Sequence, residues 1–299
     1  MNLWNDQLHL LKQGDFRSIA RIISLIENEV EGYEHFMRQL PSSTARIIGI
    51  TGAPGSGKSS ITDALIAEMI LEQKKVGVLC VDPSSPFNKG ALLGDRIRMN
   101  EWYNHPDVFI RSLASKGSLG GLHPKIIEIS DVMKAAGFDY IIIETVGVGQ
   151  SEVDIAALAD TTVVVLVPES GDIIQTMKAG LMEIADIFVV NKYDRPDADS
   201  FFNNLSQMLA PVFSGQNEIP VLKTVASQKK GIHELYKKIS DQNNSFSETK
   251  KRDLSFKKAC SIIQAGKMKN IDKEQLKKEL SEALLKEDFN IYNFAANYS

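Results

Sequence analysis

The sequence has little cysteine, no long apolar run and little net charge, and each shortage excludes a class of protein. Its two cysteines, Cys80 and Cys260, lie far apart and form neither a CxxC pair nor a metal-ligand spacing. A disulfide framework or a zinc site is therefore not expected. Because such chains suit a reducing compartment, we expect a cytoplasmic location.

No stretch of the chain is long and apolar enough to suggest a membrane partner. Purely apolar stretches such as 163–167 have the length of a strand, and the N-terminus lacks a basic start followed by an apolar run. We therefore expect neither export nor a membrane span. The formal net charge of -4 also argues against nucleic-acid binding, which needs clustered Lys and Arg.

What is present is the composition of an ordinary globular protein, with 43% hydrophobic and 24% charged residues. From residue 45 onward, strand-like and helix-like segments alternate. Several of the strand-like segments are continuous β-branched runs, which is typical of strands buried on both faces. We therefore expect an α/β fold with three layers and a mostly parallel sheet. The expected strands are 47–51, 77–82, 108–111, 140–144, 162–167, 187–191 and 221–224.

Two segments outside this alternation look helical. Residues 3–38 carry apolar side chains at helical spacing, and after residue 239 the composition shifts toward Asn, Ser, Lys and Glu, with helical stretches near 254–266 and 272–287. At 299 residues the chain has room for one main domain with extensions. We predict an N-terminal helical extension at 1–43, a nucleotide-binding domain at 44–245 and a C-terminal helical extension at 246–299.

A phosphate-binding motif follows the first expected strand. The segment has the pattern G-x-x-x-x-G-K-S between an apolar strand and a helix-forming run, as this motif requires. Its glycines let consecutive N–H groups face phosphates at a helix N-terminus. We expect Lys58 to reach the β and γ phosphates and Ser59 to ligate Mg²⁺. The predicted nucleotide-binding residues here are Gly52, Ala53, Pro54, Gly55, Ser56, Gly57, Lys58, Ser59 and Ser60.

A second motif ends the strand expected at 140–144. In DYIIIETVGVGQ an acidic residue, Glu144, is followed three positions later by Gly147. In P-loop enzymes a carboxylate at this point organises the Mg²⁺ shell, and the glycine N–H senses the γ phosphate. We therefore predict Glu144 as a catalytic and metal-site residue and Gly147 as a nucleotide contact. The simpler interpretation is that Glu144 is a surface residue at a strand end.

A third motif predicts which base is bound. N-K-x-D follows the strand expected at 187–191 and places Asn191, Lys192 and Asp194 in one loop. The carboxylate of Asp194 can accept hydrogen bonds from guanine N1–H and the exocyclic amine, a donor pair that adenine lacks. Further along, Ala226 and Ser227 lie between a strand and a helix, where a backbone N–H would meet guanine O6. A plain turn explains that last pattern as well.

Two long polar loops between the first two motifs supply further candidate carboxylates. Asp82 ends a strand and Asp95 follows Gly94. Long irregular loops at the strand ends of such a sheet are usually functional. We predict both aspartates as Mg²⁺-site residues, although either side chain would also suit a turn or a helix cap.

Taken together, these segments resemble the methylmalonyl-CoA mutase-associated GTPase chaperones, the MeaB-like family that also carries an older label as arginine/ornithine transport kinases. The resemblance extends to LKQGDFRSIARIISLIENE and covers roughly residues 10 to 240. ETVGVGQSE combined with VDPSSPF is far more specific than a generic P-loop. The matching segments are GAPGSGKSS, VDPSSPF, GALLGDRIRM, SLGGL, ETVGVGQSEVDIA and NKYD.

The resemblance implies a homodimeric GTP hydrolase that escorts an adenosylcobalamin-dependent acyl-CoA mutase, gates its cofactor loading and protects it. It implies that Asp82, Asp95 and Glu144 are the carboxylates of the Mg²⁺ site. It also implies that the segment from Glu169 to Lys178 communicates with the mutase, and we predict Gln175 and Lys178 as the residues responsible. The simpler interpretation of that segment is a solvent-facing helix start.

Other functions remain open from the sequence. A small-molecule kinase would use the same phosphate site, but the guanine-reading residues Asn191, Lys192 and Asp194 count against it. A nickel-insertion GTPase is less well matched, since none of the five histidines pairs with another His or Cys at ligand spacing. A nucleotide-gated scaffold with negligible hydrolysis also stays open, because no catalytic Gln or arginine finger is evident.

Overall fold

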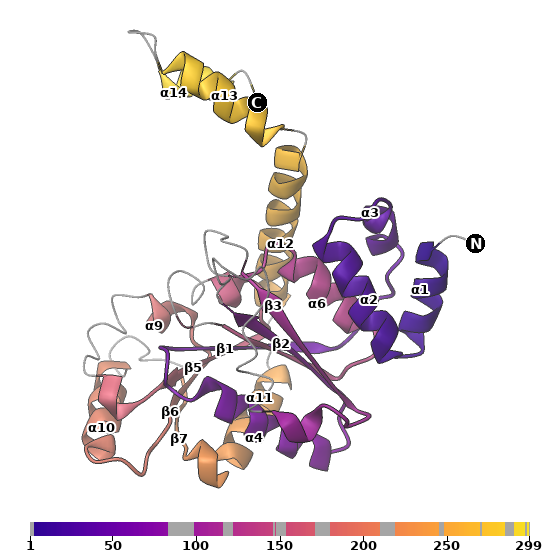
Figure 1. Cartoon of the computed structure of the whole chain (residues 1–299). Helices are drawn as coiled ribbons and strands as arrows, with labels where there is room; N and C mark the ends of the chain where they lie inside the picture. Colours follow the sequence, from indigo (N-terminus) through magenta and orange to yellow (C-terminus); the bar gives the residue numbers. More distant parts are fainter. Residues whose placement is uncertain are drawn as a thin grey trace. The chain divides into compact units, whose positions relative to one another are not determined.

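Seven strands form one sheet in the computed structural model of this chain (Figure 1). The structure describes residues 3–82, 99–115, 122–145, 147, 154–170, 180–209, 219–244, 248–269, 271–284, 290–296 and 298. The strands are β1 (Arg46–Thr51), β2 (Val76–Asp82), β3 (Val108–Ala114), β4 (Tyr140–Glu144), β5 (Thr161–Leu166), β6 (Ile187–Val190) and β7 (Val221–Lys223).

The sheet has the order β3-β2-β4-β1-β5-β6-β7, and each pair of neighbouring strands is parallel. Parallel strands place all their carboxyl ends at one edge, which collects the loops that follow them. The loop after β1 therefore starts at the centre of that edge, between the ends of β4 and β5.

Helices cover both faces of the sheet (Figure 1). On one face, α4 (Lys58–Leu71) and α11 (Ile232–Asn244) pack in one apolar cluster with strand residues such as Ile48, Ile142 and Val163. On the other face, α6 (Ile126–Ala135) packs on alternate strand residues such as Ile141 and Ile143. The expected three-layer α/β fold with a mostly parallel sheet is confirmed.

The N-terminal helices belong to the second of these faces. They are α1 (Leu3–Lys12), α2 (Phe16–Glu27) and α3 (Tyr33–Met37). Asp15 caps α2 by accepting a hydrogen bond from Ser18 N at 2.7 Å, and the apolar stripe of α2 is fully buried. This stripe joins the same cluster as Ile143 of β4 and the buried residues of α6. The stripe consists of Ile19, Ile22, Ile23 and Ile26.

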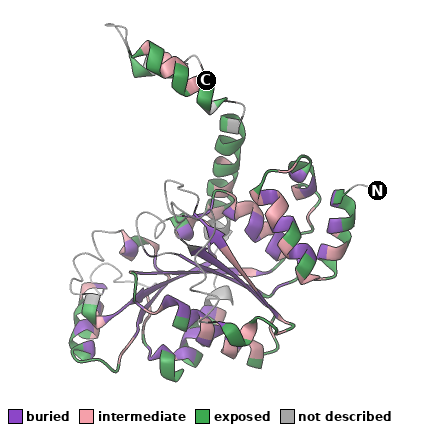
Figure 2. Cartoon of the chain, viewed as in Figure 1, coloured by how far each residue is buried: buried purple, intermediate pink, exposed green. Residues whose placement is uncertain are grey.

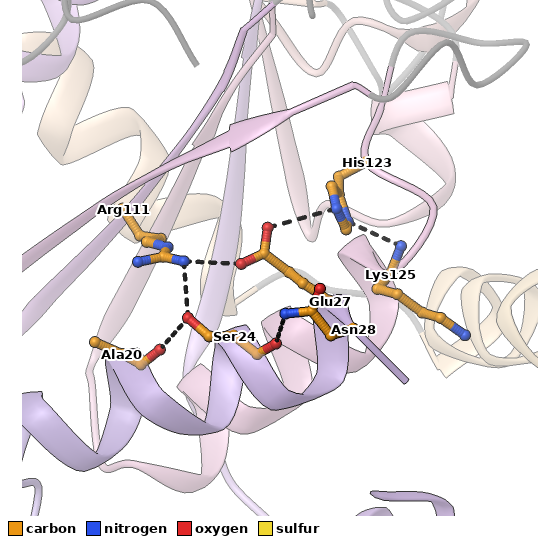
Figure 3. A network of polar contacts seen from close by, with 7 residues as sticks. All are labelled: Ala20, Ser24, Glu27, Asn28, Arg111, His123 and Lys125. Atoms are coloured by element: carbon orange, nitrogen blue, oxygen red, sulfur yellow. Dashed lines mark hydrogen bonds and ion pairs between the residues drawn. The ribbon is translucent and has the colours of Figure 1, made fainter. Parts of the chain in front are cut away.

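A polar network also ties α2 to the edge strand β3 (Figure 3). Arg111 Nη2 of β3 donates to Glu27 Oε2 at 2.8 Å and to Ser24 Oγ at 3.1 Å. His123 Nε2 lies 3.6 Å from Glu27 Oε1, while His123 Nδ1 accepts from Lys125 N. One carboxylate at the end of α2 thus contacts both β3 and the segment that leads into α6.

One strand, β3, extends well beyond its predicted end. The expected strand 108–111 ended before Ser112, a polar residue that interrupts the apolar pattern. The structure corrects this, because β3 continues to Ala114 and pairs with β2 up to Asp82. Glu27 and Ser24 supply the polar partners that allow Arg111 to lie within a strand. The remaining strands begin and end within one residue of the expected positions.

The remaining helices before residue 248 pack near the β5 and β6 side of the sheet, and the other elements are short 3-10 turns. A third apolar cluster packs α9 (Leu181–Ile184) and α10 (Ala198–Leu209) on β5 and β6. The 3-10 turns are η1 (Asn100–Trp102), η2 (Ile155–Ala157), η3 (Pro168–Ser170) and η4 (Ala226–Gln228). No helix within the described ranges combines the length and apolarity required to cross a bilayer.

Residues Met1–Ser247 form one compact unit and Glu248–Ser299 form another. The second unit contains α12 (Glu248–Lys269), α13 (Lys273–Ala283) and α14 (Ile291–Ala296). The expected helix at 254–266 was too short, since charged residues extend α12 in both directions, and α14 was not predicted. Figure 2 shows mostly exposed residues along α12 and α13. The division into 1–43, 44–245 and 246–299 stays a prediction about domain organisation.

Candidate functional site

The phosphate-binding motif connects the end of β1 to the start of α4. Gly57 is the N-cap of α4 with φ 91°, in the left-handed region that favours glycine. A Cβ at Gly57 would lie 2.3 Å from Asn191 Nδ2, so a side chain does not fit. Ser56 Oγ is buried without a hydrogen-bond partner in the described part of the chain. An orphaned hydroxyl is expected where a ligand completes a site.

Lys58 and Gly147 meet above this loop. Lys58 Nζ donates to Gly52 O at 2.8 Å and to Ala53 O at 3.1 Å. A Cβ at Gly147 would lie 2.2 Å from Gly52 O and 2.6 Å from Lys58 Nζ. The glycine of the second motif therefore lies directly against the first motif, and any larger residue would displace the lysine.

Ser59 and Glu144 are in direct contact, although 85 residues separate them. Ser59 Oγ of α4 donates to Glu144 Oε1 at the end of β4 at 2.6 Å, and only 6% of each residue is exposed. Thr62 Oγ1, one turn further along α4, donates to Glu144 Oε2 at 3.0 Å. Glu144 is thus a buried carboxylate held by two hydroxyls, and its interpretation as a surface residue is wrong.

The residues around Ser59 fit a Mg²⁺ ion that is held largely by substrate. The hydroxyl and the carboxylate are hard oxygen donors, and Mg²⁺ is usually bound by one or two such groups together with phosphates and water. In the described parts of the chain, no cluster of three or more His, Cys, Asp or Glu side chains could hold a metal by itself. A hydroxyl and a carboxylate leave room in the Mg²⁺ shell for phosphate oxygens and water.

Asn191 joins the phosphate loop to the loops predicted to read the base. Its Nδ2 donates to Ser56 O at 2.9 Å. Its Oδ1 accepts from Thr224 Oγ1 at 3.1 Å and from Ala226 N at 3.2 Å. The side chain is buried, so these bonds are shielded from water. One asparagine thereby sets the spacing between three separate loops.

The residues after Asn191 turn sharply toward solvent. Lys192 has φ 54°, an unusual conformation for a non-glycine residue, and Asp194 is exposed. Tyr193 anchors the loop on the protein side: its N–H donates to Thr224 O, and its hydroxyl donates to Asp199. Burial and the bond to Asp199 raise the pKa of Tyr193. Lys192 and Asp194 are therefore presented by a loop that is fixed at its other face.

An ion pair connects this loop to the segment predicted to contact a partner. Arg195 Nε lies 3.6 Å from Glu169 Oε1, and both side chains are about half exposed. Glu169 belongs to η3, which directly follows β5. An exposed pair of this kind adds little stability, but it places the start of the segment next to the residues predicted to read guanine.

The other predicted site residues are distributed as follows. Asp82 is the last residue of β2, at the same edge of the sheet as the phosphate loop. Pro54, Gly55, Ser60 and Ser227 are exposed, whereas Ala226 is buried in η4. Asp95, Gln175 and Lys178 lie outside the described residues.

Sequence reasoning missed two features of the site. Thr62 was not singled out, because no motif includes it. The bridging role of Asn191 was also not predicted, since the motif indicated only contact with the base. Its position at the first residue after a buried strand was the available signal.

The comparisons with known sequences place these motifs in context. The sequence profile of the family described as "Methylmalonyl Co-A mutase-associated GTPase MeaB" matches residues 19–283. A Pyrococcus abyssi protein that is named as a GTPase is 43% identical over 305 residues, which cover 97% of this chain and 94% of that protein. GTPase ArgK of Escherichia coli is 32% identical over 309 residues, covering 96% and 88%.

A third relative is named as a mutase rather than as a GTPase. The fused isobutyryl-CoA mutase of Geobacillus kaustophilus is 39% identical over 239 residues, which cover 75% of this chain and 22% of that protein. Among solved structures, a LAO/AO transport system kinase matches with a TM-score of 0.67 at 24% identity, covering 98% of this chain and 90% of its own. HypB from Helicobacter pylori, in complex with nickel, matches with a TM-score of 0.51 at 15% identity, covering 77% and 98%. At these identities both structures show a shared fold.

Proposed function

This chain belongs to the family of methylmalonyl-CoA mutase-associated GTPases, and from that membership we propose that it hydrolyses GTP to GDP and phosphate with Mg²⁺ as cofactor. We further propose that it serves as a chaperone of an adenosylcobalamin-dependent acyl-CoA mutase, gating cofactor loading and protecting the enzyme. The observation that carries the first proposal is the buried contact between Ser59 and Glu144 beside Lys58.

Each residue of that site has a distinct task in the proposed reaction. The backbone N–H groups of the phosphate loop and the N-terminus of α4 bind the phosphates. Lys58, now donating to two loop carbonyls, lies where its ammonium would reach the β and γ phosphates. Gly147 lies against Lys58 and would present its N–H to the γ phosphate.

Ser59 and Glu144 would hold the Mg²⁺ shell, together with Asp82 and Asp95 in the full set that we propose. Bound Mg²⁺ neutralises the charge that develops on the phosphates as the terminal group is transferred to water. Glu144 fits this role because both of its oxygens already accept hydrogen bonds in a buried position. Such preorganised groups cost little rearrangement when the reaction occurs.

Guanine selectivity would come from Asp194, with Lys192 lying along the nucleotide and Asn191 holding the loops. The exposed carboxylate of Asp194 is available to the two guanine donors. Ala226 would offer its backbone to O6 near Ser227, although its N–H is at present directed to Asn191 Oδ1.

The proposed mutase partner is supported by the relative in which a segment similar to this chain is part of a fused isobutyryl-CoA mutase. A GTPase joined to a mutase in one polypeptide acts at a fixed, high effective concentration. The coupling would pass through the segment from Glu169 to Lys178, and Gln175 and Lys178 would sense the mutase. The ion pair between Glu169 and Arg195 supports this choice, since Glu169, the first residue of the segment, lies beside the loop that carries Asp194.

Phosphate release tests the proposed hydrolysis. The wild-type chain should release phosphate from GTP but not from ATP, and only with Mg²⁺. Ser59→Ala should abolish turnover, whereas Ser130→Ala should not, because Ser130 lies in α6 and bonds to Ile127 O. Equal hydrolysis of ATP, or turnover that survives Ser59→Ala, would refute the assignment.

Capture of a purified partner tests the chaperone proposal. The immobilised chain should retain an adenosylcobalamin-dependent acyl-CoA mutase to different extents with a non-hydrolysable GTP analogue and with GDP. The mutase should in turn raise the GTP turnover of the wild type but not of Gln175→Ala or Lys178→Ala. Retention without any turnover would favour a nucleotide-gated scaffold. Failure to retain methylmalonyl- or isobutyryl-CoA mutase in any nucleotide state would remove the partner.

We also propose that the chain forms a homodimer through its C-terminal unit. Within α12, large apolar side chains are exposed, which is costly unless another surface covers them. The mass of the full chain in solution, measured by light scattering, should be twice 33.1 kDa. Replacing two of the exposed apolar residues of α12 by Lys should then reduce the measured mass to that of a single chain. The exposed residues are Phe256, Ile262, Ile263 and Met268.

A further inference from the structure

Thr62 contacts the carboxylate of the site although no motif includes it. It follows Ser59 by three positions on α4 and is fully buried. Its Oγ1 lies 3.0 Å from Glu144 Oε2 and 3.1 Å from Lys58 O. Both the carboxylate and the backbone of the lysine that follows Gly57 are thus within its reach.

The helix explains how two hydroxyls reach one carboxylate. Residues three apart on an α-helix lie on the same face, so Ser59 and Thr62 project toward the end of β4 together. Ser59 takes Oε1 and Thr62 takes Oε2. A carboxylate held at one oxygen can still rotate about its terminal bond, whereas one held at both oxygens has a fixed plane.

The two hydroxyls are not equivalent, because Ser59 has a second task. The proton of Ser59 points to Glu144, which leaves the lone pairs of Ser59 Oγ for a metal ion. A metal ion bound to those lone pairs would share the hydroxyl that donates to Oε1. The bond from Thr62 to Oε2 does not depend on that ion, so it keeps Glu144 in place.

We propose that Thr62 is a positioning residue for GTP hydrolysis, which acts by fixing the orientation of the Glu144 carboxylate toward Ser59. This inference rests on the proposed function. A purely structural role is the alternative, since a threonine inside a helix often bonds the carbonyl four residues earlier. Thr62 has such a bond to Lys58 O, and one hydroxyl proton serves one acceptor best. A charged acceptor is the stronger of the two.

The test compares Thr62→Val, which keeps the volume and loses the hydroxyl, with Thr62→Ser, which keeps the hydroxyl. Ser130→Ala is the matched control, because it removes another buried helical hydroxyl, bonded to Ile127 O at 2.8 Å. GTP turnover, the KM for GTP and the Mg²⁺ concentration for half-maximal turnover are measured on the full chain. Thermal unfolding of each variant is recorded in parallel.

We expect Thr62→Val to lower kcat about tenfold and to raise the half-saturating Mg²⁺ concentration several-fold, with KM for GTP nearly unchanged. Thr62→Ser should restore both values, and Ser130→Ala should alter only the unfolding temperature. A wild-type kcat and Mg²⁺ dependence in Thr62→Val would overturn the inference. So would a Thr62→Ser variant as impaired as Thr62→Val, since the methyl group would then be what matters.

Two further outcomes distinguish a failure of the Thr62 inference from a failure of the proposed GTP hydrolysis. If Thr62→Val does not fold, Thr62→Ala replaces it under the same criteria, and a normal Mg²⁺ dependence in that variant would equally overturn the inference. If the wild type itself shows no Mg²⁺-dependent GTP hydrolysis, the proposed function fails and the role of Thr62 fails with it. An active wild type with an unimpaired Thr62→Val removes the role of Thr62 alone.

Discussion

Replacing Asn191 by Ala should weaken both the fold and the nucleotide site, because this side chain holds three loops together. The substitution removes the donor to Ser56 O and the acceptor that Thr224 Oγ1 and Ala226 N share. All of these groups lie in a buried region, where a lost partner is not freely replaced by water. The phosphate loop would then be free to move relative to the base loops.

The magnitude follows from the number of bonds. Each hydrogen bond contributes about 0.5–1.5 kcal/mol, and a buried polar group left without a partner costs about 1–3 kcal/mol, so the three bonds together predict a loss of about 3 kcal/mol. A domain with a stability of about 5–15 kcal/mol survives such a loss at room temperature. Nucleotide affinity should fall about tenfold or more, since about 1.4 kcal/mol corresponds to one decade.

Urea unfolding followed by tryptophan fluorescence measures the first effect, because both tryptophans, Trp4 and Trp102, lie in the sheet-containing unit. Titration with a fluorescent GDP analogue measures the second. Asn28→Ala is the control, since Asn28 is exposed and its Nδ2 donates to the neighbouring Ser24 O within the same helix end. If Asn191→Ala unfolds at the wild-type urea concentration and binds GDP as the wild type does, the bridging role is refuted.

Four other outcomes are expected. Glu144→Gln should reduce turnover far more than GDP affinity, and equal losses in both would make Glu144 a binding or folding residue. Lys58→Ala should lose both GTP turnover and GDP affinity, as measured by phosphate release and by the titration with the GDP analogue. Asp194→Asn should weaken GTP by about one to two decades and favour xanthosine triphosphate, so an unchanged GTP titration would contradict the guanine assignment. Burial and the neighbouring Tyr140 raise the pKa of Tyr236 from 10.0 to about 12, so the unfolded chain loses that proton first as the pH rises. The free energy of unfolding should therefore decrease as the pH rises from 10.0 to about 12, and it should decrease less for Tyr236→Phe over the same pH range.

Much of the fold was accessible from the sequence because its signals are local. Continuous β-branched runs such as those of β4 and β5 fixed the strands within one residue, and their alternation with helices predicted a parallel sheet. The end of β3 escaped prediction because the polar Ser112 breaks the apolar run, and its partner in the sheet, Cys80 of β2, lies far earlier in the chain. A long-range partner of this kind leaves no trace in a local pattern.

The motifs of the site could be predicted from the sequence, but the hydrogen bonds between its residues could not. The motif residues stand at the ends of strands and helices that the sequence pattern predicts, and the structure brings them together. They are Lys58, Ser59, Glu144 and Asn191. Which hydroxyl holds which oxygen of Glu144 depends on the rotation of α4 about its axis, and that rotation is set by packing. Thr62 could therefore be identified only from the three-dimensional structure.

The packing of α2 on the sheet has a consequence for how this protein could be divided or regulated. Ile22 and Ile26 share one apolar cluster with Ile141 and Ile143, and Ile143 directly precedes Glu144 in β4. A chain begun at residue 44 would leave the buried residues of α6 in this cluster without the α2 stripe that covers them, and we expect it to aggregate rather than to act as a minimal enzyme. Through the same cluster, a protein that moves α2 from outside would shift α6 and the strand that ends in Glu144.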